Sequence, residues 1–461
     1  MLANAVFQRF LDEAPICVMV RATLEKVFAP QRLDALFHQT AVQQYERELL
    51  FSTAFEIMSL VVCRVDRSVN AAYEKRRGVV GVSVRALYDK LKNIEPQTSR
   101  ELVRATARDI QELVRALHPD REPLLPGHHI KILDGNHLEG THHRLKSLRT
   151  QGGGALPGQC LVILDADDRL LLDVLPCEDA YTQECRLAGE LLETIEADDV
   201  LLDDRQFCTS ELLFGLHRRS AFFITRQHAG HLRWELRGHR KSCGETETGE
   251  VFEQAVRLTD PETGEALTIR RVTVQLDRPT RNRDQELHIL TNLPEQVADA
   301  CRIAKLYRNR WRIETAFQEL STHLRCELQT LGYPPAALFG FCTAAACYNL
   351  FAVIQAALEG THGETIVRDD VSRYFLAEEL SSTYRGMMIA LGAEEWIGFG
   401  RMSVPELAAC LRRWSAAVDL SRYPKHLRGP KKRIYRPPAR AQHFSTARLL
   451  ADAKKNKQPP R

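Results

Sequence analysis

Apolar residues recur at helical spacing through most of the first 120 residues, for example at Leu49, Phe55 and Met58. Few turn-forming residues interrupt this pattern. We therefore expect an all-helical N-terminal domain over residues 1–120.

A glycine turn at residues 78–81 separates two of these helices. Ser83 follows as a candidate N-cap, and one apolar stripe then begins. Three basic residues lie off that stripe: Arg85, Lys90 and Lys92. A helical hairpin with exposed basic residues is compatible with a helix-turn-helix DNA reader, and equally with any other helical hairpin.

The pattern changes after residue 120 to short apolar runs that are typical of buried strands. Runs near 128–136, 159–178, 199–207 and 221–228 alternate with two helical segments, in the order strand, strand, strand, helix, strand, helix, strand. This order predicts an α/β domain with a mixed sheet over residues 125–330. A β-rich insertion is expected at 229–292, followed by one long helix from about Pro294 to Leu324.

Helical sequence resumes after the Pro334–Pro335 pair and predicts a C-terminal helical region over residues 331–420. The longest nearly apolar stretch runs from Ala336 to Ala357, but Asn349 interrupts it. A buried helix explains that stretch better than a membrane span, so we expect no membrane association. The twelve cysteines form no C-x-x-C pair, a pattern that favours reduced thiols and a cytoplasmic protein.

Charge is distributed unevenly along the 461 residues, whose hydrophobic fraction of 44% is ordinary for a globular protein. Residues 421–461 contain thirteen Lys or Arg and one acid, Asp452, for a local charge of +12; subtracting this from the total of +3 leaves −9 for the rest. The tail, with Lys431, Lys432 and Arg433, is either a DNA contact or a flexible, solvated segment.

Three carboxylates occupy positions that suit metal-dependent phosphoryl transfer. Asp134 lies at the end of the first predicted strand of the α/β domain, Asp204 at the end of the fourth, and Glu314 on the long helix. Strand ends at one sheet edge share a crevice, and a helix across it can add a third carboxylate. Converging carboxylates need a counter-charge, which Mg²⁺ supplies through oxygen ligands.

The helix around Glu314 reads YRNRWRIETAFQEL. Tyr307, Arg310 and Glu314 have the spacing i, i+3, i+7, which places them on one helix face. One interpretation is a surface helix with an Arg310–Glu314 salt bridge. The other is a tyrosine and an arginine that hold a DNA phosphate beside a metal-binding carboxylate.

These residues resemble the DDE transposases of bacterial insertion sequences. The resemblance is to the insertion-sequence-four type, which has a Tyr-Arg-Glu-Lys signature and an RNase H-like catalytic core. It covers about residues 125 to 330 through LDGNHLEGTHHRLKSLR, LLDDRQF and YRNRWRIE. It implies that Asp134, Asp204 and Glu314 bind two Mg²⁺ ions, with Mn²⁺ as a substitute, and that Tyr307 and Arg310 contact the DNA end. Asp204, rather than Asp203, matches the family's Asp-Arg-x-Phe pattern.

The sequence departs from the signature at one position, because Ser321 stands where the family has lysine. Gln318, His323 and Arg325 are nearby substitutes for that DNA contact. His142 and His143 lie in the family-like stretch after Asp134 and are further candidate DNA contacts.

The resemblance implies cut-and-paste transposition, in which metal-dependent cleavage and strand transfer act on double-stranded DNA at terminal inverted repeats and at a target. Holding two ends together implies a homodimer on DNA, in the bacterial cytoplasm. Two alternatives stay open: an RNase H-like nuclease without strand transfer, and a catalytically degenerate DNA-binding copy, which Ser321 supports.

Overall fold

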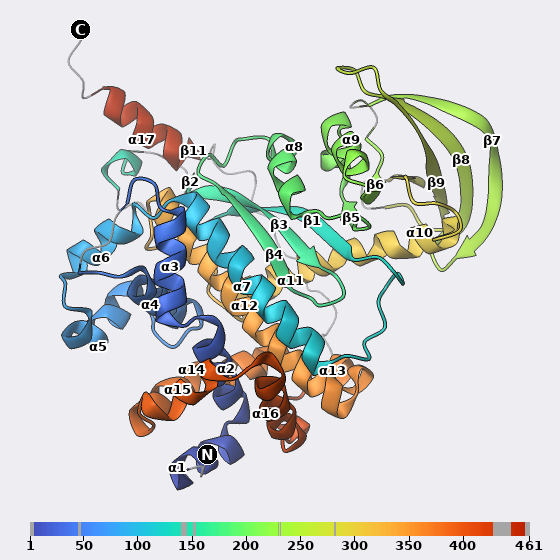
Figure 1. The fold of residues 1–461 in the computed structure, drawn as a ribbon. Coiled ribbons are helices and arrows are strands. Elements are labelled where there is room, and N and C mark those ends of the chain that lie inside the picture. The colour runs from blue at the N-terminus through green and yellow to red at the C-terminus, as the bar shows by residue number, and fades with distance from the viewer. Residues whose placement is uncertain are drawn as a thin grey trace.

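The computed structural model describes residues 4–44, 48–139, 145–150, 154–228, 230, 232–280, 283–426 and 444–456. Helices from both ends of the chain pack together against one face of a nine-stranded sheet (Figure 1). The helices that precede the sheet are α1 (Ala5–Glu13), α2 (Pro15–Val27), α3 (Pro30–Thr40), α4 (Phe51–Val62), α5 (Val69–Val80), α6 (Val84–Leu91) and α7 (Pro96–Leu117).

The predicted glycine turn joins α5 to α6. Gly81 ends α5 in a left-handed conformation with φ of 71°, and the Ser83 side chain caps α6 by accepting a hydrogen bond from the Ala86 amide. Arg85 is exposed as expected, but Lys90 is buried, with its ammonium 3.9 Å from the centre of the Phe37 ring. The expectation of an exposed Lys90 was therefore wrong, because its long apolar stem lets it cover an aromatic side chain.

The sheet has the order β4-β3-β1-β5-β6-β10-β9-β8-β7. The pairs β1–β5 and β5–β6 are parallel and the other pairs are antiparallel, so the sheet is mixed, consistent with an RNase H-like core. Its strands are β1 (Ile130–Leu138), β3 (Gly158–Asp165), β4 (Leu171–Cys177), β5 (Val200–Asp203), β6 (Phe222–Arg226), β7 (Arg233–Thr246), β8 (Gly249–Thr259), β9 (Ala266–Leu276) and β10 (Glu286–Thr291).

Both faces of the first strands are covered, because neighbouring residues of a strand point to opposite sides. Ile132 of β1 belongs to the core that contains α7 and the C-terminal helices, whereas Leu133 belongs to a second core. That second core includes 3₁₀ helix η2 (Ala188–Thr194) and helix α9 (Ser210–Arg218), whose N-cap is Thr209. The short helix α8 (Glu184–Leu187) precedes η2.

The expected β-rich insertion continues the central sheet rather than forming a separate layer. Strand β10 pairs with β6 on one side and with β9 on the other, and β8 and β7 then extend the sheet outward (Figure 1). Strand β7 forms one edge of the sheet, opposite the β4 edge, and most of its residues are exposed.

The single helix expected from Pro294 to Leu324 is instead two helices. Helix α10 (Ala300–Tyr307) is capped by Asp299, and helix α11 (Trp311–Thr322) follows 3₁₀ helix η4 (Arg308–Arg310). The apolar pattern alone does not reveal this break, since a 3₁₀ turn changes the periodicity only slightly.

Helix α12 (Pro334–His362) is the long apolar helix that the sequence predicts to be buried. Among the described residues it alone is long and apolar enough to cross a membrane, and its apolar window is entirely buried in the protein. Its polar Asn349 is explained by the sheet: the side chain accepts from the Leu171 amide and donates to the Leu171 carbonyl, and so pairs with edge strand β4. The helices that follow are α13 (Glu364–Asp370), α14 (Arg373–Ala390), α15 (Glu394–Arg401) and α16 (Val404–Ala416).

Part of the C-terminal tail, for which a flexible segment was one of two interpretations, is folded. Strand β11 (Phe444–Ser445) pairs with β2 (Ala155–Leu156), and helix α17 (Thr446–Lys455) follows it. Arg448 of α17 forms an ion pair of 2.7 Å with Asp179 of the α/β domain. The flexible-tail expectation was wrong for these residues, because it rested on composition and could not include pairing with a distant strand.

Candidate active site

Asp134 and Asp204 come together because their strands are parallel neighbours. Ile130 pairs with Val200 and Ile132 with Leu202, so the same offset brings Asp134 opposite Asp204 just beyond the paired residues. Asp134 was expected at the end of its strand, but β1 continues to Leu138, since β3 still pairs with it on the other side.

Asp203 and Asp204 have different surroundings. Asp203 is fully buried, and its carboxylate accepts a hydrogen bond from the Thr225 hydroxyl. Asp204 is half-buried, caps η3 (Arg205–Phe207), and lines a cavity together with Asp134. Asp204 is therefore the residue of the two that a ligand in the cavity can reach.

Tyr307, Arg310 and Glu314 lie on the connected helices that face β1. Arg310 donates to Asp134 Oδ2 over 3.2 Å and to Glu314 Oε1 over 3.1 Å. Its side chain is only 11% exposed, and the Tyr307 side chain is buried close to it. The expected Arg310–Glu314 salt bridge is thus present, and it extends to Asp134.

The electrostatics of Asp134 reflect this crowding. Burial raises its pKa to about 6, although Arg310 and the Gly135 amide oppose the rise, while Asp204 and Glu184 add to it. Burial opposes the charge on Arg310, but Tyr307, Asp134, Asp204 and Glu314 together raise its pKa above the ordinary value. The site therefore favours added positive charge near Asp134.

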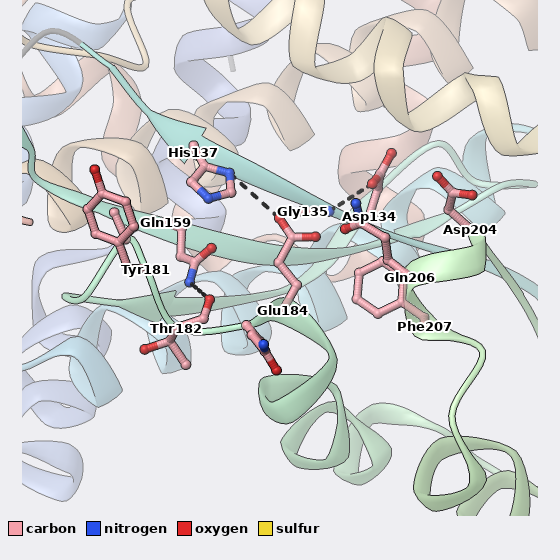
Figure 2. Close-up of a pocket in the computed structure, with 12 residues that line it drawn as sticks. Asp134, Gly135, His137, Gln159, Tyr181, Thr182, Glu184, Asp204, Gln206 and Phe207 are labelled. Atoms are coloured by element: carbon pink, nitrogen blue, oxygen red, sulfur yellow. Dashed lines mark hydrogen bonds and ion pairs between the residues drawn. The ribbon is translucent and has the colours of Figure 1, made fainter. Parts of the chain in front are cut away.

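The cavity beside Asp134 has a volume of about 510 Å³ (Figure 2). The segment from Ala180 to Glu184 forms one wall, and β1 and η3 contribute the others. Glu184 was not identified from the sequence. Its carboxylate extends from α8 toward Gly135 and lies between His137 and Asp134 in Figure 2. The sequence offers no signal for it, because it stands among other acids in an ordinary helical segment.

Carboxylate oxygens are the ligands that Mg²⁺ and Mn²⁺ accept, so the donor chemistry fits the ions expected here. Asp134 and Asp204 face one cavity, but the Arg310 guanidinium stands between Asp134 and Glu314. Within the described part of the chain, no three His, Cys, Asp or Glu side chains are grouped closely enough to hold one ion. A single ion held by all three of these carboxylates would therefore require Arg310 to release Asp134 and Glu314.

Other candidate DNA contacts have varied surroundings. Arg325 is half-buried and donates to the Arg67 carbonyl over 2.6 Å, so it joins the N-terminal helices to the end of α11. Ser321 is exposed. Trp311, next to Arg310, is 60% exposed. The remaining candidates lie outside the described residues: His142, His143, Lys431, Lys432 and Arg433.

Fold and site together define a mixed α/β domain in which two aspartates from adjacent parallel strands face a cavity, and an arginine links one of them to a glutamate on a helix. Residues 125–350 match the family model of the transposase DDE domain. This match supports a DDE transposase domain, a transposase function in general and DNA as the substrate. No curated protein matches the sequence.

Proposed function

We propose that this protein is an insertion-sequence transposase of the type with the Tyr-Arg-Glu-Lys signature, and that it cleaves DNA ends and joins them to a target. One observation carries the proposal: Asp134 and Asp204 meet at equivalent positions of parallel strands, and Arg310 connects Asp134 to Glu314. The transposase DDE domain over residues 125–350 supports it.

Asp134, Asp204 and Glu314 would hold the divalent cations. Two such ions, when bound, supply activation of the attacking oxygen and stabilisation of the leaving oxygen in phosphoryl transfer. Arg310 now bridges two carboxylates, because one guanidinium nitrogen donates to Asp134 and another donates to Glu314. Once cations neutralise those carboxylates, its guanidinium is available for a phosphate oxygen, a geometry that arginine recognises well.

The proposed reaction determines which DNA the protein binds and how many copies of the protein take part. Cut-and-paste transposition requires two double-stranded ends, each carrying a terminal repeat, in one complex, so we propose a homodimer on DNA in the cytoplasm. Phosphates would be held by Tyr307 and Arg310 near the scissile bond, and by the basic residues of the C-terminal segment farther away.

A product assay tests the proposal against a nuclease that does not transfer strands. Labelled DNA with the element's own ends is incubated with Mg²⁺ and a plasmid target, using the wild type and Asp204→Asn. We expect wild type to cleave the ends and to join them covalently to the plasmid, and Asp204→Asn to do neither. Cleavage without joined product would favour the nuclease.

A degenerate DNA-binding copy is the second candidate, and exposed Ser321 at the signature lysine position favours it. Restoring the residue with Ser321→Lys separates the two cases. For an active enzyme, Ser321→Lys changes the rate of a reaction that wild type already performs. A wild type that binds the ends and never cuts them, in Mg²⁺ or Mn²⁺, would establish the degenerate copy.

A further inference from the structure

Glu184 lies unusually close to the backbone beside Asp134. It is the first residue of α8, and its carboxylate rests against Gly135, where a Cβ atom would lie 2.2 Å from Glu184 Oε1. Such a distance is far shorter than any van der Waals contact. Glycine at position 135 therefore lets the Glu184 carboxylate reach the strand next to Asp134.

The cavity that Glu184 lines is acidic. Among its twelve described lining residues are three carboxylates, Asp134, Glu184 and Asp204, and no Lys or Arg. The basic side chain that faces Glu184 is His137, whose Nδ1 lies 3.6 Å from Glu184 Oε1. His137 carries a positive charge only when it is protonated. Burial raises the pKa of Glu184, His137 opposes that rise, and Asp204 adds to it.

A second, independent feature of the cavity is an oxygen without a partner. Gln159 is fully buried on β3, and its Nε2 donates to the carbonyls of Asp179 and Thr182. Those bonds fix the amide, while its Oε1 has no hydrogen-bond partner. Gln159 lines the cavity, and in Figure 2 this oxygen points toward Glu184 and His137. A buried acceptor without a donor costs free energy, unless a ligand satisfies it.

We propose that this cavity binds a divalent cation and that Glu184 is a fourth carboxylate of the cation site, with Gln159 Oε1 as a further oxygen. Gly135 and His137 alternate with Asp134 along β1, so Glu184 approaches on the strand face opposite α11 and Arg310. Mg²⁺ keeps several water ligands, so the carboxylates need not converge directly on the ion. The inference rests on the proposed function, since Asp134 and Asp204 serve both.

Binding of Mn²⁺ to the full-length protein, followed by electron paramagnetic resonance at pH 7.5 without DNA, tests the proposal. We compare wild type with Glu184→Gln, Asp134→Asn and the control Glu178→Gln, which removes a half-buried carboxylate of the neighbouring segment that does not line the cavity. We expect Glu184→Gln to weaken Mn²⁺ binding at least about tenfold, Asp134→Asn to remove it, and Glu178→Gln to leave it unchanged.

Gly135→Ala provides a second test that keeps every carboxylate. Its added Cβ displaces the flexible end of Glu184, so Mn²⁺ affinity should fall in the wild-type background and should not fall further when Glu184→Gln is present. Wild-type affinity in both Glu184→Gln and Gly135→Ala, with loss in Asp134→Asn, would overturn the role of Glu184 and leave the proposed function intact. Full Mn²⁺ binding by Asp134→Asn would overturn the proposed function itself. Equal losses in Glu184→Gln and Glu178→Gln would also overturn the proposal, since the effect would then be one of net charge.

Discussion

Replacing Asp134 with asparagine should stabilise the metal-free protein at neutral pH. Burial raises the pKa of Asp134 from 3.8 to about 6, so the folded protein holds this proton more tightly than the unfolded chain does. Well below pH 3.8 the carboxyl is protonated in both states and costs nothing. Between about pH 4 and 6 the unfolded chain ionises while the buried carboxyl still holds its proton, so the free energy of unfolding falls.

The size of this effect follows from the pKa change. At about 1.4 kcal/mol for each tenfold change in proton affinity, a rise from 3.8 to about 6 corresponds to about 3 kcal/mol. The Asp134 side chain is 21% exposed, so solvent screening reduces this value only in part. The prediction concerns the pH-dependent part alone, because the intrinsic difference between an amide and a protonated carboxyl does not vary with pH.

Urea unfolding of wild type and Asp134→Asn at pH 4, 5, 6, 7 and 8, with a chelator present, measures the difference between their free energies of unfolding. We expect the stability of Asp134→Asn relative to wild type to increase by about 2.5 kcal/mol from pH 4 to pH 8, mostly between pH 4 and 6.5. Added Mg²⁺ should reduce the difference at pH 8, since a cation favours the ionised carboxylate. A difference that does not change with pH would refute the argument that burial perturbs Asp134.

Two further predictions concern the packing that supports the site. Arg100 and Asp173 form a buried ion pair of 2.8 Å between α7 and β4, so Arg100→Met should cost about 3–5 kcal/mol in urea unfolding, and Arg100→Met/Asp173→Leu should recover most of it. Full stability of the Arg100→Met single variant would contradict this. A Cβ on Gly360 of α12 would lie 2.4 Å from a backbone oxygen at the end of α7, so Gly360→Ala should lower the stability by about 1–3 kcal/mol. The control Gly386→Ala, with open space around it, should be neutral or stabilising, and equal effects of the two would refute the steric reason.

Much of the α/β domain could be predicted, because its local signals agree with its final structure. Apolar runs that end at polar turns predicted the strands of the core, and in the helices before it Ser83 marked the start of α6. The sequence could predict that Asp134 and Asp204 lie on strands near one edge of the sheet. It could not predict the register between β1 and β5 that places them opposite each other. Register depends on pairing between strands about 70 residues apart, which local periodicity does not encode.

The features that were missed arise from long-range contacts. Lys90 is buried because Phe37 offers an aromatic face, and α17 is held because Arg448 reaches Asp179. Glu184 joins the cavity because α8 places its carboxylate over Gly135. Each of these depends on which surfaces meet after folding, and a single sequence contains no separate signal for that.

The central claim is that Asp134, Asp204 and Glu314 catalyse metal-dependent cutting of DNA ends, and cleavage by Glu314→Gln tests it most directly. DNA carrying the element's flanking ends is incubated with Mg²⁺ and either wild type or Glu314→Gln, and binding of both proteins to the same DNA is measured in parallel. We predict cleavage by wild type alone, with binding retained by both. Cleavage by Glu314→Gln at the wild-type rate would contradict the assignment of Glu314 and the account of the active site built on it.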